Sequence, residues 1–139
     1  MDQLASYLPP AEGLLPKWLL LLSAVSIGNS IQAYLTLSYT RRVYNNPTPS
    51  ASQATPLSSR TFGTYTGLAS IVRLYAAYHI TEKAWFEIAF WTYVVAGWHF
   101  GSEWLVFRTA KMGEGLVGPI VISTVTMVWM WLQWGFYVG

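Results

Sequence analysis

The residues best suited to chemistry in this sequence are an imidazole and a carboxylate four positions apart. His99 and Glu103 have the spacing that places two side chains on one face of an α-helix. Such a pair could hold a metal ion or pass a proton. A zinc site normally has three or four protein ligands, however, and the whole chain holds two His and no Cys. The pair is therefore expected to be structural or to face a partner, with no metal and no cofactor.

A second candidate is the positive charge of Arg73, which stands in the middle of the apolar stretch Thr61–Thr81. An exposed charge inside a membrane costs at least about 2.5 kcal/mol, so Arg73 should face protein, water or a polar headgroup. A very short turn follows, which makes this stretch and the next one an antiparallel hairpin. The hairpin sets Arg73 level with Thr92 and Tyr93. Arg73 is therefore expected to bond Tyr93, Glu87 or another helix.

These polar side chains form one candidate structural cluster, comprising Arg73, Glu87, Tyr93, His99 and Glu103. Along the hairpin Glu87 is about 7.5 Å from the level of Arg73, whereas Glu103 is about 16 Å away. Glu103 should therefore lie near the membrane surface, beside Arg60 or Arg108. Two alternatives stay open: a proton or transport path along Arg73, His99 and Glu103, and a sterol- or lipid-binding site that combines Arg73 with Trp91 and Trp98.

Residues Gly113 to Gly118 spell G-x-G-x-x-G, the pattern of dinucleotide-binding sites. That chemistry needs a strand before the motif, a helix after it and an acidic residue about 20 positions further on. Here a polar segment precedes the motif, Pro119 follows it directly, and no acidic residue occurs after Glu114. The match is accidental, and no nucleotide-dependent enzyme is expected.

The elements that carry these residues follow from an apolar composition. Of 139 residues 53% are hydrophobic and only 10% are charged, against about 25% charged in soluble domains. Fourteen charged side chains could not cover the surface of so small a soluble fold. The chain is therefore expected to be a membrane protein. Its net charge of +2 is too small and scattered for nucleic-acid binding, and the lack of Cys excludes a disulfide framework.

Four segments have the length of a membrane-spanning helix, which needs about 20 mostly apolar residues. The expected spans are residues 18–38, 61–81, 84–107 and 115–138. The first and last are free of charge, whereas the middle two carry Arg73, Glu87 and Glu103. The segment 39–60 is rich in Pro, Ser, Thr and Asn and is expected to be a flexible polar loop. The sequence thus predicts an all-α four-helix membrane bundle, a single domain over 1–139.

Basic residues near the span ends predict the orientation. One side of the expected membrane holds five of them, Arg41, Arg42, Arg60, Arg108 and Lys111. The other side, with both termini and the hairpin turn, holds only Lys17 and Lys83. The long loop is therefore expected in the cytosol, where the five basic residues form a candidate surface for partners.

Two G-x-x-x-G motifs mark places where helices could approach closely. One contains Gly63 and Gly67, the other Gly97 and Gly101. Small residues at this spacing favour close packing of helices in lipid. Packing within the bundle and docking of another helix, from a partner or a second copy, both stay open.

Several strings of polar and aromatic residues resemble the ergosterol biosynthetic protein 28 family. The segments that carry this resemblance are Gly28–Tyr34, Pro56–Thr66, Arg73–Ile80, Thr92–Leu105 and Phe107–Ala110. The similarity runs from about Leu19 to Thr126. Such strings inside expected membrane spans are specific, whereas the polar loop is the part least like the family.

The resemblance implies a multi-pass protein of the endoplasmic-reticulum membrane with no catalytic activity of its own. Family members act as a scaffold for sterol C4-demethylation in ergosterol biosynthesis. The implied partners are a C4-methyl sterol oxidase, a decarboxylating 3β-hydroxysteroid dehydrogenase (the sterol C4 decarboxylase), a 3-keto sterol reductase and further enzymes such as the sterol methyltransferase. Membrane lipid and a second copy of the chain are also expected contacts, and the family has no active-site motif to carry over.

Overall fold

Helices form wherever the sequence is predominantly apolar. The computed structural model describes residues 6–44, 54–110 and 114–138, and these residues contain helices and no strand. The helices are α2 (Leu15–Leu35), α3 (Ser38–Val43), α4 (Pro56–Tyr78), α5 (Lys83–Leu105), α6 (Glu114–Leu132) and α7 (Trp134–Tyr137). The predicted all-α fold class is confirmed. In the described part of the chain, α2 alone has both the length and the apolar composition of a membrane span; the apolar stretch Leu116–Leu132 is shorter.

The segment 39–60, predicted to be a loop throughout, is partly helical. Its first residues belong to α3, and its last five form the first turns of α4. The reason lies in local capping: the Thr55 side chain accepts from the Ser58 backbone N–H, the Ser58 hydroxyl accepts from the Thr55 backbone N–H, and Pro56 starts the helix. The rest of the predicted loop, residues 45–53, lies outside the described residues.

The other helix ends also differ from the prediction, by a few residues each. Helix α2 starts three residues before the predicted Trp18, because Pro16 suits the first turn, and it ends at Leu35, where Thr36 is extended. Helix α4 ends at Tyr78 rather than Thr81. The predicted span 115–138 is interrupted at Gln133, which separates α6 from α7.

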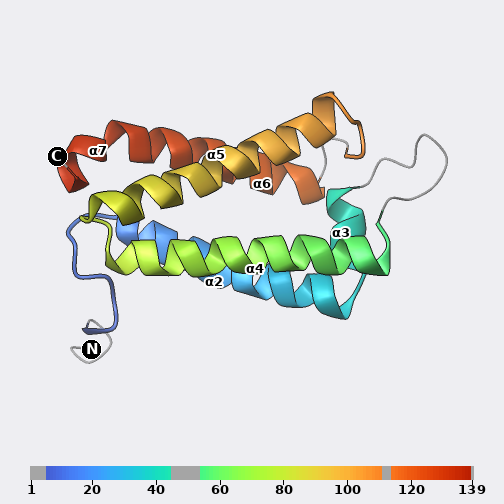
Figure 1. Ribbon diagram of the computed structural model, residues 1–139, viewed down its shortest axis with the longest axis horizontal. Coiled ribbons are helices and arrows are strands. Elements are labelled where there is room, and N and C mark those ends of the chain that lie inside the picture. Colours follow the sequence, from blue (N-terminus) through green and yellow to red (C-terminus); the bar gives the residue numbers. More distant parts are fainter. Residues whose placement is uncertain (1–5, 45–53, 111–113, 139) are drawn as a thin grey trace.

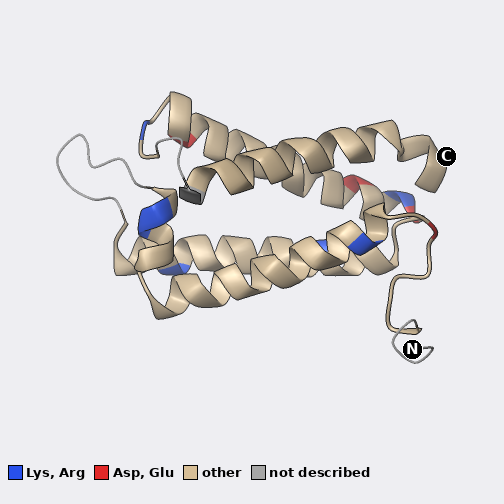
Figure 2. Cartoon of the chain, turned by 180° about the vertical axis from the view of Figure 1, so that it is seen from behind, with Lys and Arg blue, Asp and Glu red and all other residues tan. Residues whose placement is uncertain are grey.

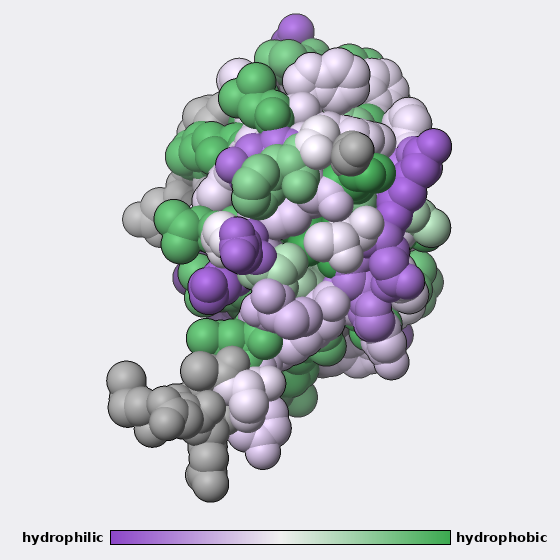
Figure 3. Space-filling view, turned by 90° about the vertical axis from the view of Figure 1, so that its left-hand side faces the viewer, coloured by the Kyte–Doolittle hydropathy of each residue, from purple (hydrophilic) through white to green (hydrophobic). Residues whose placement is uncertain are grey.

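The long helices are arranged as two pairs, α2 with α4 and α5 with α6 (Figure 1). The short turn between α4 and α5 joins the pairs at one end, where both termini also lie. Helix α3 and the end of α5 lie at the opposite end. We call these the hairpin end and the loop end. Figure 3 looks onto the hairpin end, where hydrophilic side chains lie among hydrophobic ones.

Helices α2 and α4 are in direct backbone contact. A Cβ atom added to Gly63 would lie 3.0 Å from the Ser30 carbonyl oxygen and 2.9 Å from the Tyr34 ring. A Cβ at Gly67 would lie 3.0 Å from Ser30 Oγ. The Ser30 hydroxyl donates to the Gly63 carbonyl at 2.6 Å. One glycine motif is therefore used inside the chain, to seat α4 on α2.

The buried side chains form two clusters. The hairpin-end cluster joins all four long helices and contains Leu15, Leu19, Leu22, Ala76, Ala77, Ile80, Phe86, Ala89, Tyr93, Met130 and Tyr137. The loop-end cluster contains Ala33, Val43, Phe62, Ala96, Phe100, Ala110 and Leu116. Between the two clusters the α2–α4 pair and the α5–α6 pair leave a cavity in the core. The candidate site lies in this cavity.

Candidate functional site

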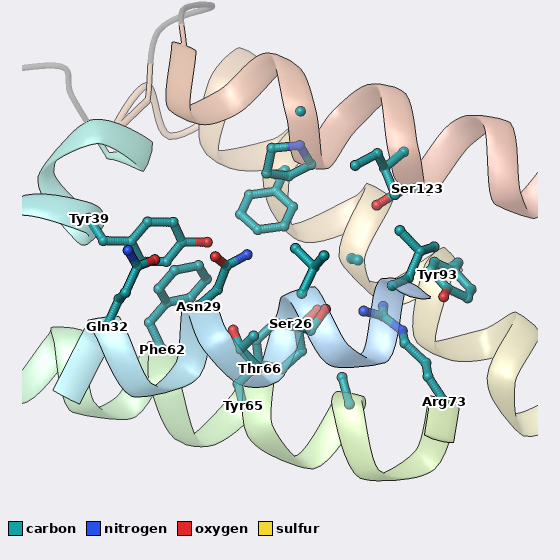
Figure 4. Close-up of a pocket in the computed structure, with 18 of the residues that line it drawn as sticks. Ser26, Asn29, Gln32, Tyr39, Phe62, Tyr65, Thr66, Arg73, Tyr93 and Ser123 are labelled. Atoms are coloured by element: carbon teal, nitrogen blue, oxygen red, sulfur yellow. The ribbon is translucent and has the colours of Figure 1, made fainter. Parts of the chain in front are cut away.

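A cavity of about 350 Å³ lies between the two helix pairs (Figure 4). Its walls come from α2, α3, α4, α5 and α6, and they include members of both buried clusters. We call it the central cavity. The polar residues that line it are Ser26, Asn29, Gln32, Tyr39, Arg42, Tyr65, Thr66, Arg73, Tyr93 and Ser123. A half-enclosed cavity with several polar groups in its wall thus lies among helices whose outer faces carry many exposed hydrophobic side chains.

Arg73 is the charged group at the inner end of the central cavity. Its side chain is only 8% exposed, with Nε donating to Thr92 Oγ1 at 3.1 Å and Nη2 donating to the Thr92 carbonyl at 3.3 Å. Its Cζ lies 4.0 Å from the centre of the Tyr93 ring, a cation–π contact visible in Figure 4. Arg73 therefore contacts Thr92 and Tyr93, the two residues that the predicted hairpin register places at its level. In the described part of the chain no carboxylate lies within ion-pair distance of Arg73.

Glu87, another member of the predicted polar cluster, is away from this arginine. Its carboxylate lies 3.8 Å from Lys83 Nζ, one turn earlier on α5, and the pair is largely exposed. Exposed pairs of this kind stabilise a helix by only about 0.3–0.5 kcal/mol. Glu87 thus belongs to the polar hairpin end rather than to the central cavity.

His99 and Glu103 line a second cavity, of about 630 Å³, at the loop end. A hydrogen bond of 2.5 Å joins Tyr44 Oη to His99 Nε2, and Glu103 accepts one from the Thr109 hydroxyl. Burial, reinforced by the negative charge of Glu103, raises the pKa of Tyr44 well above its usual range. Tyr44 therefore stays protonated at any physiological pH. His99 is thus held by Tyr44, which follows α3, and Glu103 is held by Thr109, which follows α5.

The predicted polar cluster is therefore divided in space. Arg73 and Tyr93 line the central cavity, whereas His99 and Glu103 line the loop-end cavity. Phe62 and Tyr65 line both cavities, so their aromatic rings form the wall between them. In residues 6–44, 54–110 and 114–138 no group of three or more His, Asp or Glu is placed to hold a metal ion.

The predicted basic surface is gathered at the loop end, where blue segments lie in Figure 2. Arg41 and Arg42 are exposed in the last turn of α3, Arg60 is exposed on the first turns of α4, and Arg108 is exposed just after α5. Lys111 lies outside the described residues. Arg42 also lines the central cavity, which gives that cavity a cation on α3 as well as the one on α4.

The second glycine motif has different surroundings from the first. Among the described residues, a Cβ atom at Gly101 would meet nothing within 4 Å, and one at Gly97 would meet only the end of Met127, at 3.7 Å. Trp98 beside them is 72% exposed. This face of α5 therefore has space for a further helix, whereas the face of α4 with Gly63 and Gly67 is covered by α2.

Sequence reasoning missed the part of the cavity wall that α2 supplies. Leu22, Ser26 and Asn29 line the cavity, and they are spaced four and three residues apart on one face of α2. Polar side chains at helical spacing inside an apolar span are the signal that could have identified this face. Ser123 is the single polar side chain among the described lining residues of α6, so the lining has no second polar residue at helical spacing on that helix.

Comparison with known proteins places the chain in a family. The family model described as Erg28 like protein matches residues 15–128. The chain belongs to the Erg28-like family. It is 52% identical to ergosterol biosynthetic protein 28 of Candida albicans, over 91% of this chain and 90% of that protein. It is 49% identical to the Saccharomyces cerevisiae protein of the same name, over 92% and 85%, and 30% identical to the Homo sapiens homolog, over 84% and 81%. No solved structure matches the chain.

Proposed function

We propose that this protein is a non-catalytic scaffold of ergosterol biosynthesis in the endoplasmic-reticulum membrane. Its partners are the C4-methyl sterol oxidase, the sterol C4 decarboxylase, the 3-keto sterol reductase and the sterol methyltransferase. Family membership supports the pathway, since the relatives are named for ergosterol biosynthesis. The observation that carries the tethering role is the open face of α5 around Gly97 and Gly101, which can seat a partner helix.

The proposal includes four membrane spans. Helices α4 and α5 each have 23 residues, which corresponds to about 34 Å at 1.5 Å per residue and exceeds a hydrocarbon core of about 30 Å. Mean hydropathy underestimates how well α4 suits a membrane span, because the average includes the charge of Arg73, although that side chain faces the protein interior. On α5 the exposed side chains include Trp91 and Trp98, which suit a lipid-facing surface. The basic loop end then faces the cytosol, and Arg41 and Arg60 are exposed there to soluble domains of the partners.

A tether acts through local concentration. Sequential enzymes bound to one small membrane protein meet each intermediate sooner, because the second encounter is effectively intramolecular. A scaffold of this kind needs no catalytic group. It needs surfaces that bind, which are here the α5 face and the basic loop end.

The proposal is tested by mild-detergent purification of the tagged protein with quantitative mass spectrometry. Gly101→Leu should lower recovery of the sterol enzymes on the order of tenfold, the effect of losing about 1.4 kcal/mol of contact. The same change should leave the fold intact or stabilise it by up to about 1 kcal/mol, because Leu is the better helix former and no atom of the described residues lies within 4 Å of the added Cβ.

The matched control is Gly28→Leu, which also introduces Leu at a helical glycine with no atom within 4 Å but on α2. It should leave partner recovery unchanged. Sterol analysis of the same cells should show C4-methyl or 3-keto sterols accumulating with Gly101→Leu alone. Loss of self-association in place of enzyme recovery would assign the α5 face to a second copy of the chain. Full recovery of every enzyme with Gly101→Leu would remove the α5 face from the scaffold.

A further inference from the structure

The described residues that line the central cavity include cations and no anion. Arg73 lines it from α4 and Arg42 lines it from α3, and none of the described lining residues is Asp or Glu. Arg73 is almost fully buried, and burying a charge is costly unless it is paired or hydrogen-bonded. Its wall contacts are neutral: one threonine and one aromatic ring. The cavity is therefore electrostatically suited to a negatively charged group.

The hydrogen-bonding capacity at the inner end of the cavity is only partly used. A guanidinium group has five N–H donors, and the two bonds to Thr92 use one at Nε and one at Nη2. Beside it the Tyr93 hydroxyl is buried and has no hydrogen-bond partner in the described part of the chain. Buried polar groups of this kind normally have a partner. Arg73 and Tyr93 come from facing helices and are in contact, as Figure 4 shows, so one acceptor placed beside both would use the capacity of both.

The rest of the wall indicates what kind of molecule would carry this group. Leu22, Val25 and Ile122 line the cavity together with neutral polar side chains, and α2, the helix with the length and composition of a membrane span, forms one side of it. The cavity is only half-enclosed, and 350 Å³ lies at the lower end of the range for ligand sites. It would hold the polar end of a lipid whose apolar part extends outward between the helices.

We propose that the central cavity binds an amphipathic lipid that carries one carboxylate, with the Arg73 guanidinium and the Tyr93 hydroxyl donating to the carboxylate oxygens. A planar guanidinium matches a carboxylate with two parallel hydrogen bonds. Arg42 is exposed to solvent, so Arg73 is the buried cation of the described lining and balances a single negative charge, whereas a phosphate monoester would bring up to two. This site is separate from the α5 face, so its failure in a binding test would leave the tethering proposal standing.

The test uses the full-length protein in nanodiscs of neutral phosphatidylcholine. Two radiolabelled carboxylates serve as probes: oleate, which has a linear body, and cholesteryl hemisuccinate, which has a sterol body. Their neutral counterparts, oleyl alcohol and ergosterol, serve as competitors. We expect saturable binding of at least one carboxylate that its neutral counterpart does not displace. Binding of only one probe assigns the body of the lipid, and binding of both shows that the carboxylate alone is recognised.

Three variants locate the binding. Arg73→Gln should weaken it on the order of tenfold or more, as expected for the loss of a charge-assisted pair. Arg60→Gln, an exposed arginine on the same helix outside the cavity, is the matched control and should leave the affinity unchanged. Ser26→Phe fills the cavity from α2 and leaves Arg73 in place in the sequence, so it should reduce binding even if Arg73→Gln proves too unstable to measure.

Four results would overturn the proposal: equal binding of neutral and carboxylated lipids, displacement of both carboxylates by phosphatidic acid at lower concentration, an equal loss of affinity in Arg60→Gln and Arg73→Gln, and unchanged binding in Ser26→Phe. The first would show that only the apolar body is recognised, and the second that the site prefers a phosphate. The third would show attraction to the basic surface as a whole. The fourth would place the ligand outside the central cavity.

Discussion

The two helix pairs of this protein are held together by different kinds of contact. Between α2 and α4 the contacts are short and polar, made by glycines and hydroxyl groups, as in the Ser30 bond to the Gly63 carbonyl. The α5 side of the molecule is held by large aromatic rings: Phe86 and Phe90 of α5 lie 5.0 and 5.5 Å, centre to centre, from the Trp134 ring of α7, and Phe90 lies 6.3 Å from the Trp131 ring of α6. The α2–α4 pair is thus packed with its backbones close together, whereas the α5 side is packed through bulky side chains.

The difference explains why the same glycine pattern has two outcomes in one chain. On α4 the glycines are covered by α2, because α2 brings its own small residue, Ser30, to the contact. On α5 the facing residue is the long side chain of Met127 on α6, the one contact that Gly97 makes among the described residues. In this chain the G-x-x-x-G motif is closely packed where the facing helix brings the small residue Ser30 and is open where it brings Met127.

The largest effect is expected from breaking the aromatic pair with Phe86→Ala. Phe86 is fully buried against Trp134 and Tyr137, so truncation leaves a cavity in the hairpin-end cluster. We expect a loss of about 3 kcal/mol in the free energy of unfolding, the lower end of the range for this change. Thermal or denaturant unfolding in detergent measures it. Phe107→Ala, at an exposed phenylalanine, should cost far less; equal losses would contradict the aromatic account.

The backbone-fitted pair is broken by Gly63→Leu. The new side chain would overlap the Ser30 carbonyl and the Tyr34 ring, so α4 must move away from α2. Overpacking of this kind costs about 2 kcal/mol, set against the better helix propensity of Leu. The same unfolding measurement should show no loss for Gly101→Leu. If both glycine variants unfold alike, the contrast between the two motifs is wrong.

A smaller effect is expected from Ser59→Ala, which sharpens the comparison within the α2–α4 pair. Ser59 is 2% exposed, and its hydroxyl donates to the Ala33 carbonyl at 2.5 Å and lies 2.8 Å from Thr40 Oγ1. Ala33 is in the last turn of α2, where carbonyls have no partner inside the helix. Removing the hydroxyl should cost about 1–2 kcal/mol. Thr61→Ala, which loses an exposed bond within its own helix, should cost less than about 0.5 kcal/mol; a larger loss there would assign the effect to helix propensity.

The sequence predicted the features that depend on local pattern and hairpin register. The apolar stretches became helices, and the short turn before Lys83 set Arg73 against Thr92 and Tyr93. The helix ends were less predictable, because a single capping pair at Thr55 and Ser58 moved the start of α4 into a segment that reads as loop by composition.

The candidate site was less predictable than the fold, because it depends on how helices distant in sequence are paired. His99 and Glu103 share a face of α5 with correct spacing, yet Phe62 and Tyr65 from α4 separate them from Arg73. The sequence likewise did not show which of the two glycine motifs is covered, because that depends on which helix face Ser30 of α2 contacts. Helix spacing gives the face of a residue, whereas its partner is a property of the tertiary structure.

The bonds around Ser59 also have a consequence for how the chain tolerates change. They tie the end of α2 and the middle of α3 to the start of α4, so these helices are joined without using the connection between Tyr44 and Ala54. Lengthening such a connection costs only loop-closure entropy, about 0.6 kcal/mol for each doubling. This connection is therefore the natural place to insert an epitope or a fluorescent domain while both helix pairs keep their structure.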